Sequence, residues 1–396
     1  MVIHSDRMAR LRYVQEFLIP AVLVIASILA VTGCNYGEKL SPEAIAGRPL
    51  ALVRNGNYWG FIDSMGNWVV KPAYRYALPF SDGLGLVRQN NRLGYLDKSG
   101  KIAIKPRFSD AQPFSEGLAR VFVDSKWGFI NRSGTLIIPP QFDDTGDFRE
   151  GRARVKIGQR WGFIDSSGVM IVKPRFDNAD NFHNGYAQVM TGGLCGFIDR
   201  NGNLLEDLQF ENTNSFTEGL APVQILGYWG YIDSTGIVAI EPQFDEAWSF
   251  SEGLAFVRVL EWLGYINTFG ELVIGFNFVD AWSFTEGMAP VKNEHGWQYI
   301  DTSGKAIQHY FDIALSFSEG LAAVKERDIV NNLQGEGKWG YIDRTGNYVI
   351  PCQFDDVGPF SEGIAAVRVG EKWGYIDRSG KIVVKLRFDR AFPFTK

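Results

Sequence analysis

Carboxylates recur at a fixed place in this sequence, where they could serve acid–base chemistry or bind calcium. Eight of them follow a short segment of the Trp-Gly-Tyr-Ile type: Asp63, Asp97, Asp165, Asp199, Asp233, Asp301, Asp343 and Asp377. Two further copies carry Asn131 and Asn267, whose amides are neither acids nor bases. A Gly lies three residues after each position, as in turns that a short polar side chain caps and a Gly closes at positive φ. The pattern therefore predicts structural turns.

A second row of carboxylates precedes a Gly in the recurring segment Phe-Ser-Glu-Gly-Leu-Ala. Its members are Glu116, Glu150, Glu218, Glu252, Glu286, Glu319 and Glu362, with Asp82 and Asn184 in two other copies. Two catalytic carboxylates need distinct environments, so that one is protonated while the other is ionised. Equivalent residues in equivalent repeats offer no such difference, and we interpret this row as structural too.

Residues that could act as nucleophiles or metal ligands are few and scattered. Cys195 stands where most repeats have Trp and Cys352 where several have Pro, so both read as small apolar replacements; a disulfide between them is the alternative. His183, His295 and His309 occupy unrelated repeat positions and predict no shared metal site. The sequence also lacks Gly-x-Ser-x-Gly, phosphate-loop and His-Glu-x-x-His motifs. We therefore expect no enzyme, no cofactor and no metal.

Three tryptophans depart from the repeat and are the candidate ligand-binding residues. Trp248 and Trp282 occupy the same variable position in successive repeats, where other copies accept Asp or Gly. Trp262 lies just before Leu263, at a position that elsewhere holds Lys126 or Arg160. Together they predict an exposed aromatic patch that binds sugar faces or a protein partner. The alternative is local repacking beside Leu263, which replaces the usual Trp.

All these residues belong to one repeat that fills most of the chain. The repeat is anchored at Trp59, Leu93, Trp127, Trp161, Cys195, Trp229, Leu263, Trp297, Trp339 and Trp373. Every step is 34 residues except the step to Trp339, which is 42. The aromatic segment, the Asp-x-x-Gly turn and the following Ile-Val run form a hairpin, and Ser-Glu-Gly turns the chain into a further strand. The pattern therefore predicts three or four antiparallel strands in each unit. The 44 Gly and 14% aromatic residues of the chain agree with many turns and short strands.

The repeated Trp-Gly-aromatic-Ile-Asp-x-x-Gly core resembles the WG-repeat family of bacterial β-repeat proteins. The resemblance covers residues 50–394 and implies all-β modules, often on secreted or envelope proteins, without general enzymatic activity. Leu93, Cys195 and Leu263 in place of Trp, and Gln298 in place of Gly, are departures that we expect to weaken packing locally. The fold class is thus all-β, with ten tandem units in a propeller-like toroid; an open solenoid of β-hairpins is the alternative.

The N-terminus has the features of an export and anchoring signal. Three Arg precede an apolar run at residues 17–31, which is short for a membrane span and has the length of a signal-peptide core. The sequence Val-Thr-Gly-Cys at residues 31–34 resembles the bacterial lipobox, which predicts lipidation of Cys34. The domain prediction is a signal peptide at 1–33, a lipidated Cys and tether at 34–49, and the repeat array at 50–396.

The functional expectation is an envelope-anchored, non-catalytic binding or scaffold protein with a protein partner. A formal net charge of −5 argues against a nucleic-acid partner, since such proteins need a basic surface. Membrane contact is expected through the N-terminal lipid only. The alternative is a carbohydrate or peptidoglycan binder that uses the Trp248 and Trp282 region, and an enzyme with a site in a central channel is a third interpretation.

Overall fold

The computed structural model describes residues 47–207, 209–326, 329–330, 333–334 and 337–395. The expected signal peptide, Cys34 and most of the tether lie outside these residues. Every regular element of the described part is a β-strand. None of its residues forms a helix long and apolar enough to cross a bilayer.

One four-stranded antiparallel sheet, called a blade below, shows the unit that repeats. In blade three the strands are β8 (Asp110–Ala111), β9 (Leu118–Val123), β10 (Lys126–Asn131) and β11 (Leu136–Phe142). They pair in the order β11-β10-β9-β8, so each strand lies beside its neighbour in the chain. We call them the inner, second, third and outer strand. The Trp-Gly segment forms the third strand, and the Ile-Val run forms the outer one, as the sequence predicts.

The blades are numbered along the chain by their third strands. The inner strands are β40 (Arg390–Thr395), β4 (Ala77–Ser81), β8, β12 (Asp144–Thr145), β16 (Asn178–Ala179), β19 (Asn212–Thr213), β23 (Glu246–Ala247), β27 (Asp280–Ala281), β30 (Ile313–Ala314) and β36 (Asp356–Val357). The second strands are β1 (Leu50–Asn55), β5 (Leu84–Gln89), β9, β13 (Arg152–Ile157), β17 (Tyr186–Thr191), β20 (Leu220–Ile225), β24 (Leu254–Val259), β28 (Met288–Asn293), β31 (Ala322–Glu326) and β37 (Ile364–Val369).

The third and outer strands are given in the same blade order, and blades five and eight have three strands without an outer one. The third strands are β2 (Tyr58–Ile62), β6 (Arg92–Asp97), β10, β14 (Arg160–Asp165), β18 (Leu194–Asp199), β21 (Tyr228–Asp233), β25 (Trp262–Asn267), β29 (Gly296–Asp301), β34 (Lys338–Ile342) and β38 (Lys372–Asp377). The outer strands are β3 (Trp68–Tyr74), β7 (Ile102–Phe108), β11, β15 (Met170–Phe176), β22 (Val238–Phe244), β26 (Leu272–Phe278), β35 (Tyr348–Phe354) and β39 (Ile382–Phe388). The longer loop of blade nine carries a short ribbon of β32 (Ile329–Val330) and β33 (Leu333–Gln334).

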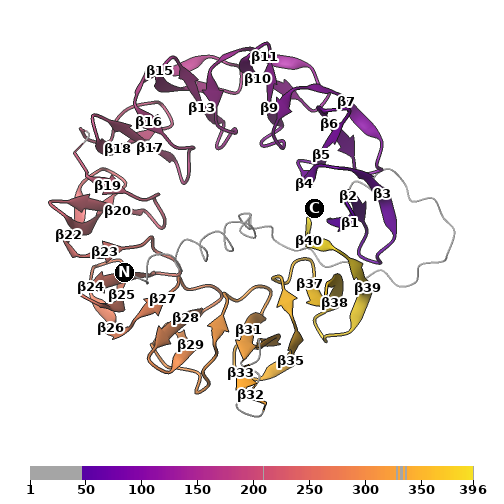
Figure 1. Cartoon of the computed structure of the whole chain (residues 1–396). Coiled ribbons are helices and arrows are strands. Elements are labelled where there is room, and N and C mark those ends of the chain that lie inside the picture. The colour runs from indigo at the N-terminus through magenta and orange to yellow at the C-terminus, as the bar shows by residue number, and fades with distance from the viewer. Residues whose placement is uncertain (1–46, 208, 327–328, 331–332, 335–336, 396) are drawn as a thin grey trace. The chain divides into compact units, whose positions relative to one another are not determined.

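The ten sheets close into a ring, because the C-terminal strand completes the first blade (Figure 1). β40 pairs antiparallel with β1, with Leu50 opposite Thr395 and Ala51 opposite Phe394. The propeller-like prediction is therefore confirmed, and the open solenoid is excluded for the described part of the chain. In Figure 1 the outer strands β3, β7 and β39 lie on the outside of the ring.

Local sequence explains the shape of each blade. A Cβ on Gly60 would lie 2.5 Å from the carbonyl oxygen of Val70, so the outer strand approaches the third strand where only Gly leaves room. Blade eight has Gln298 at this place, and it is one of the two blades with three strands; blade five, the blade of Cys195, is the other. Blades two and seven keep four strands although Leu93 and Leu263 replace Trp.

The hydrophobic cores lie between neighbouring blades. In one of them Tyr95 of blade two packs edge-on against Phe114 of blade three, with ring centroids 4.8 Å apart. The Tyr95 hydroxyl also donates a hydrogen bond of 2.7 Å to the backbone oxygen of Gln112. Since the aromatic rings of one blade are buried by the next blade, no blade can bury its own core alone.

Candidate functional site

The recurring Glu joins consecutive blades. The Glu116 carboxylate accepts hydrogen bonds of 2.6 and 2.8 Å from the backbone N–H groups of Glu150 and Gly151, in the equivalent turn of the next blade. The same bond to the next turn Gly is made by Asp82, Glu150, Glu218, Glu252, Glu286 and Glu319. These carboxylates are occupied by the fold, as a structural role requires.

A second connection, called the Asp bridge below, joins consecutive blades on the opposite edge. The Asp after an outer strand accepts from a Lys or Arg of its own third strand and from a backbone N–H in the hairpin of the next blade. Asp143 receives Lys126 Nζ at 2.5 Å and Gly158 N at 2.7 Å. Equivalent bridges centre on Asp177, Asp355 and Asp389. The Lys126 bond holds the pKa of Asp143 below its ordinary value.

Blades five to eight, like blade one with Tyr58, lack the cation of this bridge. Their third strands begin with Leu194, Tyr228, Trp262 and Gly296 instead of Lys or Arg. The first three side chains are exposed by 42, 53 and 46%. Between blades seven and eight the acid is lost as well, since Val279 follows the outer strand. Asp stands there in most other blades, with Glu211 in blade five, whereas blades one and two have Arg75 and Ser109.

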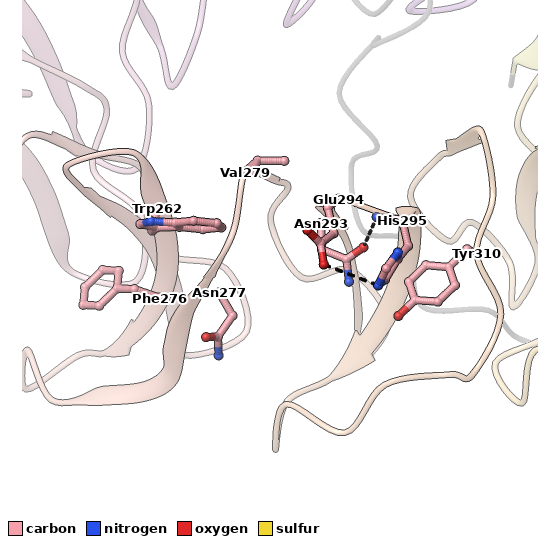
Figure 2. Close-up of a pocket in the computed structure, with 8 residues that line it drawn as sticks. All are labelled: Trp262, Phe276, Asn277, Val279, Asn293, Glu294, His295 and Tyr310. Atoms are coloured by element: carbon pink, nitrogen blue, oxygen red, sulfur yellow. Dashed lines mark hydrogen bonds and ion pairs between the residues drawn. The ribbon is translucent and has the colours of Figure 1, made fainter.

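An open groove of about 450 Å³ lies where both halves of the bridge are missing. Its lining residues are Trp262, Phe276, Asn277, Val279, Asn293, Glu294, His295 and Tyr310. Figure 2 shows Trp262 and Phe276 on one wall and Glu294, His295 and Tyr310 on the other. Blade seven supplies the first wall from β25 and β26, and blade eight supplies the second from the end of β28 and the loops beside it.

The polar wall of the groove is held in place by short-range contacts. The backbone N–H of His295 donates to Asn293 Oδ1 at 2.9 Å, and His295 Nε2 lies 3.6 Å from Glu294 Oε1. The His295 and Tyr310 rings meet edge-on at 5.4 Å. The Glu294 side chain itself is largely exposed, so its carboxylate is available to a ligand.

Two hairpin tips, one in blade six and one in blade seven, carry leucines in an unfavourable backbone conformation. Leu226 has φ 52° and is 85% exposed, and Leu260 has φ 55° and is 78% exposed. This left-handed region suits Gly, Asn or Asp, and other hairpins use Asn90, Asp124 or Gly158 there. We call the exposed residues Leu194, Leu226, Tyr228, Leu260 and Trp262 the apolar arc.

The three tryptophans named from the sequence lie in different surroundings. Trp262 lines the groove, whereas Trp248 and Trp282 are half-buried and are not among its lining residues. Trp248 stacks on Phe256 at 4.3 Å, and Trp282 meets Trp297 edge-on at 6.2 Å. Ligand binding by Trp248 and Trp282 stays a prediction.

The variable position of Trp248 and Trp282 has a structural reason. Its backbone oxygen accepts a hydrogen bond of 2.8 Å from Tyr231 in the case of Trp248, and from Tyr265 in the case of Trp282. Because the recurring contact at this position is a hydrogen bond to the backbone oxygen, different side chains can occupy it without loss of that bond.

Sequence reasoning missed most of the groove. Phe276, Asn277, Asn293, Glu294 and Tyr310 attract no notice singly, and His295 entered only as a metal ligand that was set aside. The one available indication is paired: Trp262 replaces the cation of the Asp bridge, and Val279 replaces its acid in the same repeat.

The remaining reactive side chains of the described residues form no second site. Cys195 and Cys352 are free thiols, and burial raises the pKa of both. His309 Nε2 lies 2.6 Å from Glu326 Oε1. Among the described residues no group of His, Cys, Asp and Glu is arranged to hold a metal ion.

Comparison with known proteins agrees with this geometry. The family model described as "WG containing repeat" matches residues 59–92, 94–127, 127–161, 161–195, 196–229, 229–260, 264–297, 297–328, 339–373 and 373–396. No curated protein matches the sequence significantly.

Several solved structures resemble this chain at low sequence identity, and one of those named here has a TM-score above 0.5. A crystal structure of a eukaryotic initiation factor has a TM-score of 0.51 and 10% identity, covering 87% of this chain and 98% of that one. AztD of Citrobacter koseri has a TM-score of 0.34 and 11% identity, covering 88% and 97%. PorZ of Porphyromonas gingivalis, a surface component of the type-IX secretion system, has a TM-score of 0.27 and 11% identity, covering 78% and 51%.

Proposed function

This chain belongs to the WG-repeat family, and on that basis we propose that it is a non-catalytic binding or scaffold protein that engages a protein partner through the apolar arc. The observation that carries the proposal is the arc itself. Three consecutive blades replace a charged position with Leu194, Tyr228 and Trp262, next to the exposed Leu226 and Leu260.

The residues of the arc do not stabilise the folded chain by themselves. Exposed leucines gain no burial energy, and a bulky residue at positive φ costs about 1 kcal/mol or more. Exposed apolar residues with aromatic members are typical of protein interfaces, where Tyr and Trp dominate the binding energy. When a partner buries the arc, the burial of these side chains contributes free energy that offsets the backbone strain.

The test compares cross-linked partners of the full chain and a double variant. Leu226→Asn with Leu260→Asn removes two apolar tips while Asn tolerates positive φ, so we expect an intact fold and loss of the partner. Ser125→Asn at the tip of blade three is the matched control, since Ser125 also has positive φ (65°). An unchanged partner set in the double variant would contradict the proposal.

We further propose that the protein is exported and held at a bacterial membrane by a lipid on Cys34. The support is the short apolar run at residues 17–31 followed directly by the lipobox-like Cys. Cys34→Ala is expected to leave an unprocessed precursor in the membrane fraction, detected by its mass. A Cys34→Ala protein with the mature mass of the wild type would refute lipidation.

A glycan ligand is the second candidate, and Trp262 favours it. An exposed indole can stack on a sugar face while Asn277 and Asn293 offer donors and acceptors to hydroxyls. Glycan arrays probed with the full chain and with Trp262→Ala separate this candidate from the protein partner.

A further inference from the structure

We propose that the groove between blades seven and eight receives an arginine or lysine side chain, so that the partner segment lying on the apolar arc is basic. The inference rests on the proposed function and adds the chemistry of the partner. Three observations carry it: the place of the groove in the repeat, its lining, and the charge around it.

The first observation is that the chain places its own cation here in other blades. Lys126, Arg160, Lys338 and Lys372 each reach, from the start of a third strand, the carboxylate of an Asp bridge at the equivalent seam. At blade seven the third strand supplies Trp262 instead, and the space beside it stays open. A cation brought by a partner therefore enters a position that the repeat is already shaped to accommodate.

The second observation is the chemistry of the lining. Trp262, Phe276 and Tyr310 contribute aromatic rings, and Glu294 contributes a carboxylate. The face of an indole attracts a cation, and a guanidinium can stack on it while its N–H groups bind a carboxylate in pairs. No Lys or Arg is among the lining residues. The lining thus favours a cation over an anion.

The third observation is the surplus of acid along the arc. Glu211 and Asp245 keep the bond to the next hairpin, accepting from Gly227 N at 2.9 Å and Leu260 N at 2.6 Å. Their blades lack the Lys or Arg of the bridge, and neither acid is in an ion pair among the described residues. With Glu261 beside Trp262, the arc is apolar and acidic, which complements an apolar and basic segment.

The experiment uses the full chain and a microarray of random 12-residue peptides. We expect bound peptides to be enriched in Arg or Lys beside Leu or Ile. For the tightest peptide, Arg→citrulline keeps the shape and removes the charge, and we expect affinity to fall about tenfold to hundredfold.

Variants assign the effect to the groove. Glu294→Gln and Trp262→Ala are each expected to weaken the Arg peptide about tenfold or more, with the fold checked by thermal melting. Glu371→Gln removes an exposed carboxylate from the hairpin of blade ten and serves as the matched control. It is expected to bind like the wild type.

The outcomes separate this inference from the function on which it rests. Bound peptides without Arg or Lys enrichment that are lost in the Leu226→Asn, Leu260→Asn variant would overturn the cation site and leave the protein-binding surface standing. Absence of any bound peptide, or equal binding of the citrulline peptide, also overturns it. Glycan binding that disappears in Trp262→Ala would assign the groove to a saccharide instead.

Discussion

At the scale of single residues, the two leucines at positive φ are apolar and exposed, whereas Glu residues at positive φ, such as Glu116 and Glu150, are bonded to the next blade. Leu226 and Leu260 combine positive φ with almost complete exposure, and neither property stabilises the fold. By contrast, the recurring Asp and Glu resemble catalytic or metal-binding residues, but their carboxylates accept hydrogen bonds from backbone N–H groups of turns. Asp165 Oδ1, for example, accepts from Ser167 N at 2.9 Å and Val169 N at 3.0 Å.

The hairpin strain gives the first prediction. Leu260→Asn is expected to raise the free energy of unfolding by about 0.5–1 kcal/mol, because Asn tolerates the left-handed region. Urea unfolding measures the change. Leu136→Asn, at an exposed site in the outer strand β11, is the control and should lower stability, since Asn is a poor strand former. Equal effects at both sites would contradict the strain argument.

The Asp turn gives the second prediction. Asp165→Asn should change stability by less than about 0.5 kcal/mol, since Asn131 already makes the same bonds to Ser133 N and Thr135 N. Gly168→Val should cost about 2 kcal/mol or more, because φ is 87° and a Cβ would lie 3.2 Å from Ile138. Thermal melting of the two variants checks both, and loss of a binding activity from Asp165→Asn alone would revive the carboxylate interpretation.

At the scale of elements, the blade is stable only with its neighbour. Its core is completed by the next blade, its turn Glu binds the turn of the next blade, and its hairpin is bound by the Asp of the preceding blade. One seam that lacks the Asp bridge holds the groove, beside Trp262 and Val279, which replace both partners of the bridge.

Rebuilding that bridge is the third prediction. Trp262→Lys with Val279→Asp should close the groove, abolish ligand binding and leave stability unchanged or raised by up to about 1 kcal/mol, since an exposed ion pair contributes little. The reciprocal pair Arg160→Trp with Asp177→Val opens the bridge between blades four and five and should lower the melting temperature. Retained binding after the rebuilding would show that the ligand lies elsewhere.

At the scale of the whole molecule, the ring is closed by the first and last strands of the repeat array, β1 and β40. Beyond the β40–β1 ladder, Asp389 accepts Lys372 Nζ and Gly56 N, each at 2.5 Å, and so joins blade ten to blade one. Lys372, together with the Gly56 N–H, lowers the pKa of Asp389 from its ordinary value of 3.8.

The lowered pKa gives the fourth prediction. A carboxyl whose pKa is lower in the folded state stabilises fully above its ordinary pKa, and this contribution is lost as the pH falls through the folded value. Asp389→Asn should therefore be less stable than the wild type at pH 6, and the difference should shrink as the pH drops below about 3.8. Urea unfolding between pH 6 and 2.5 measures it. A difference that grows towards acid would contradict the assignment.

Much of the fold could be predicted because its causes are local. Local contacts determine the Asp-x-x-Gly turns and the three or four strands of each unit, which recur with the 34-residue period. Such contacts join residues a few positions apart, so a short stretch of sequence predicts them. Trp262 stood out for the same reason, as a break in a local pattern. Its partners in the groove did not, because Glu294 and Tyr310 lie in the next repeat.

The sequence by itself determined the unit, its strands and the places where the repeat is broken. The tertiary structure alone decided that ten units close into a ring, that the recurring Glu binds the next turn, and that Trp262 faces a groove. The reason is physical: closure depends on the summed small rotation between consecutive blades, and the bonds and the groove join residues about one repeat apart. No single repeat encodes that sum, so it appears only when every blade is in place.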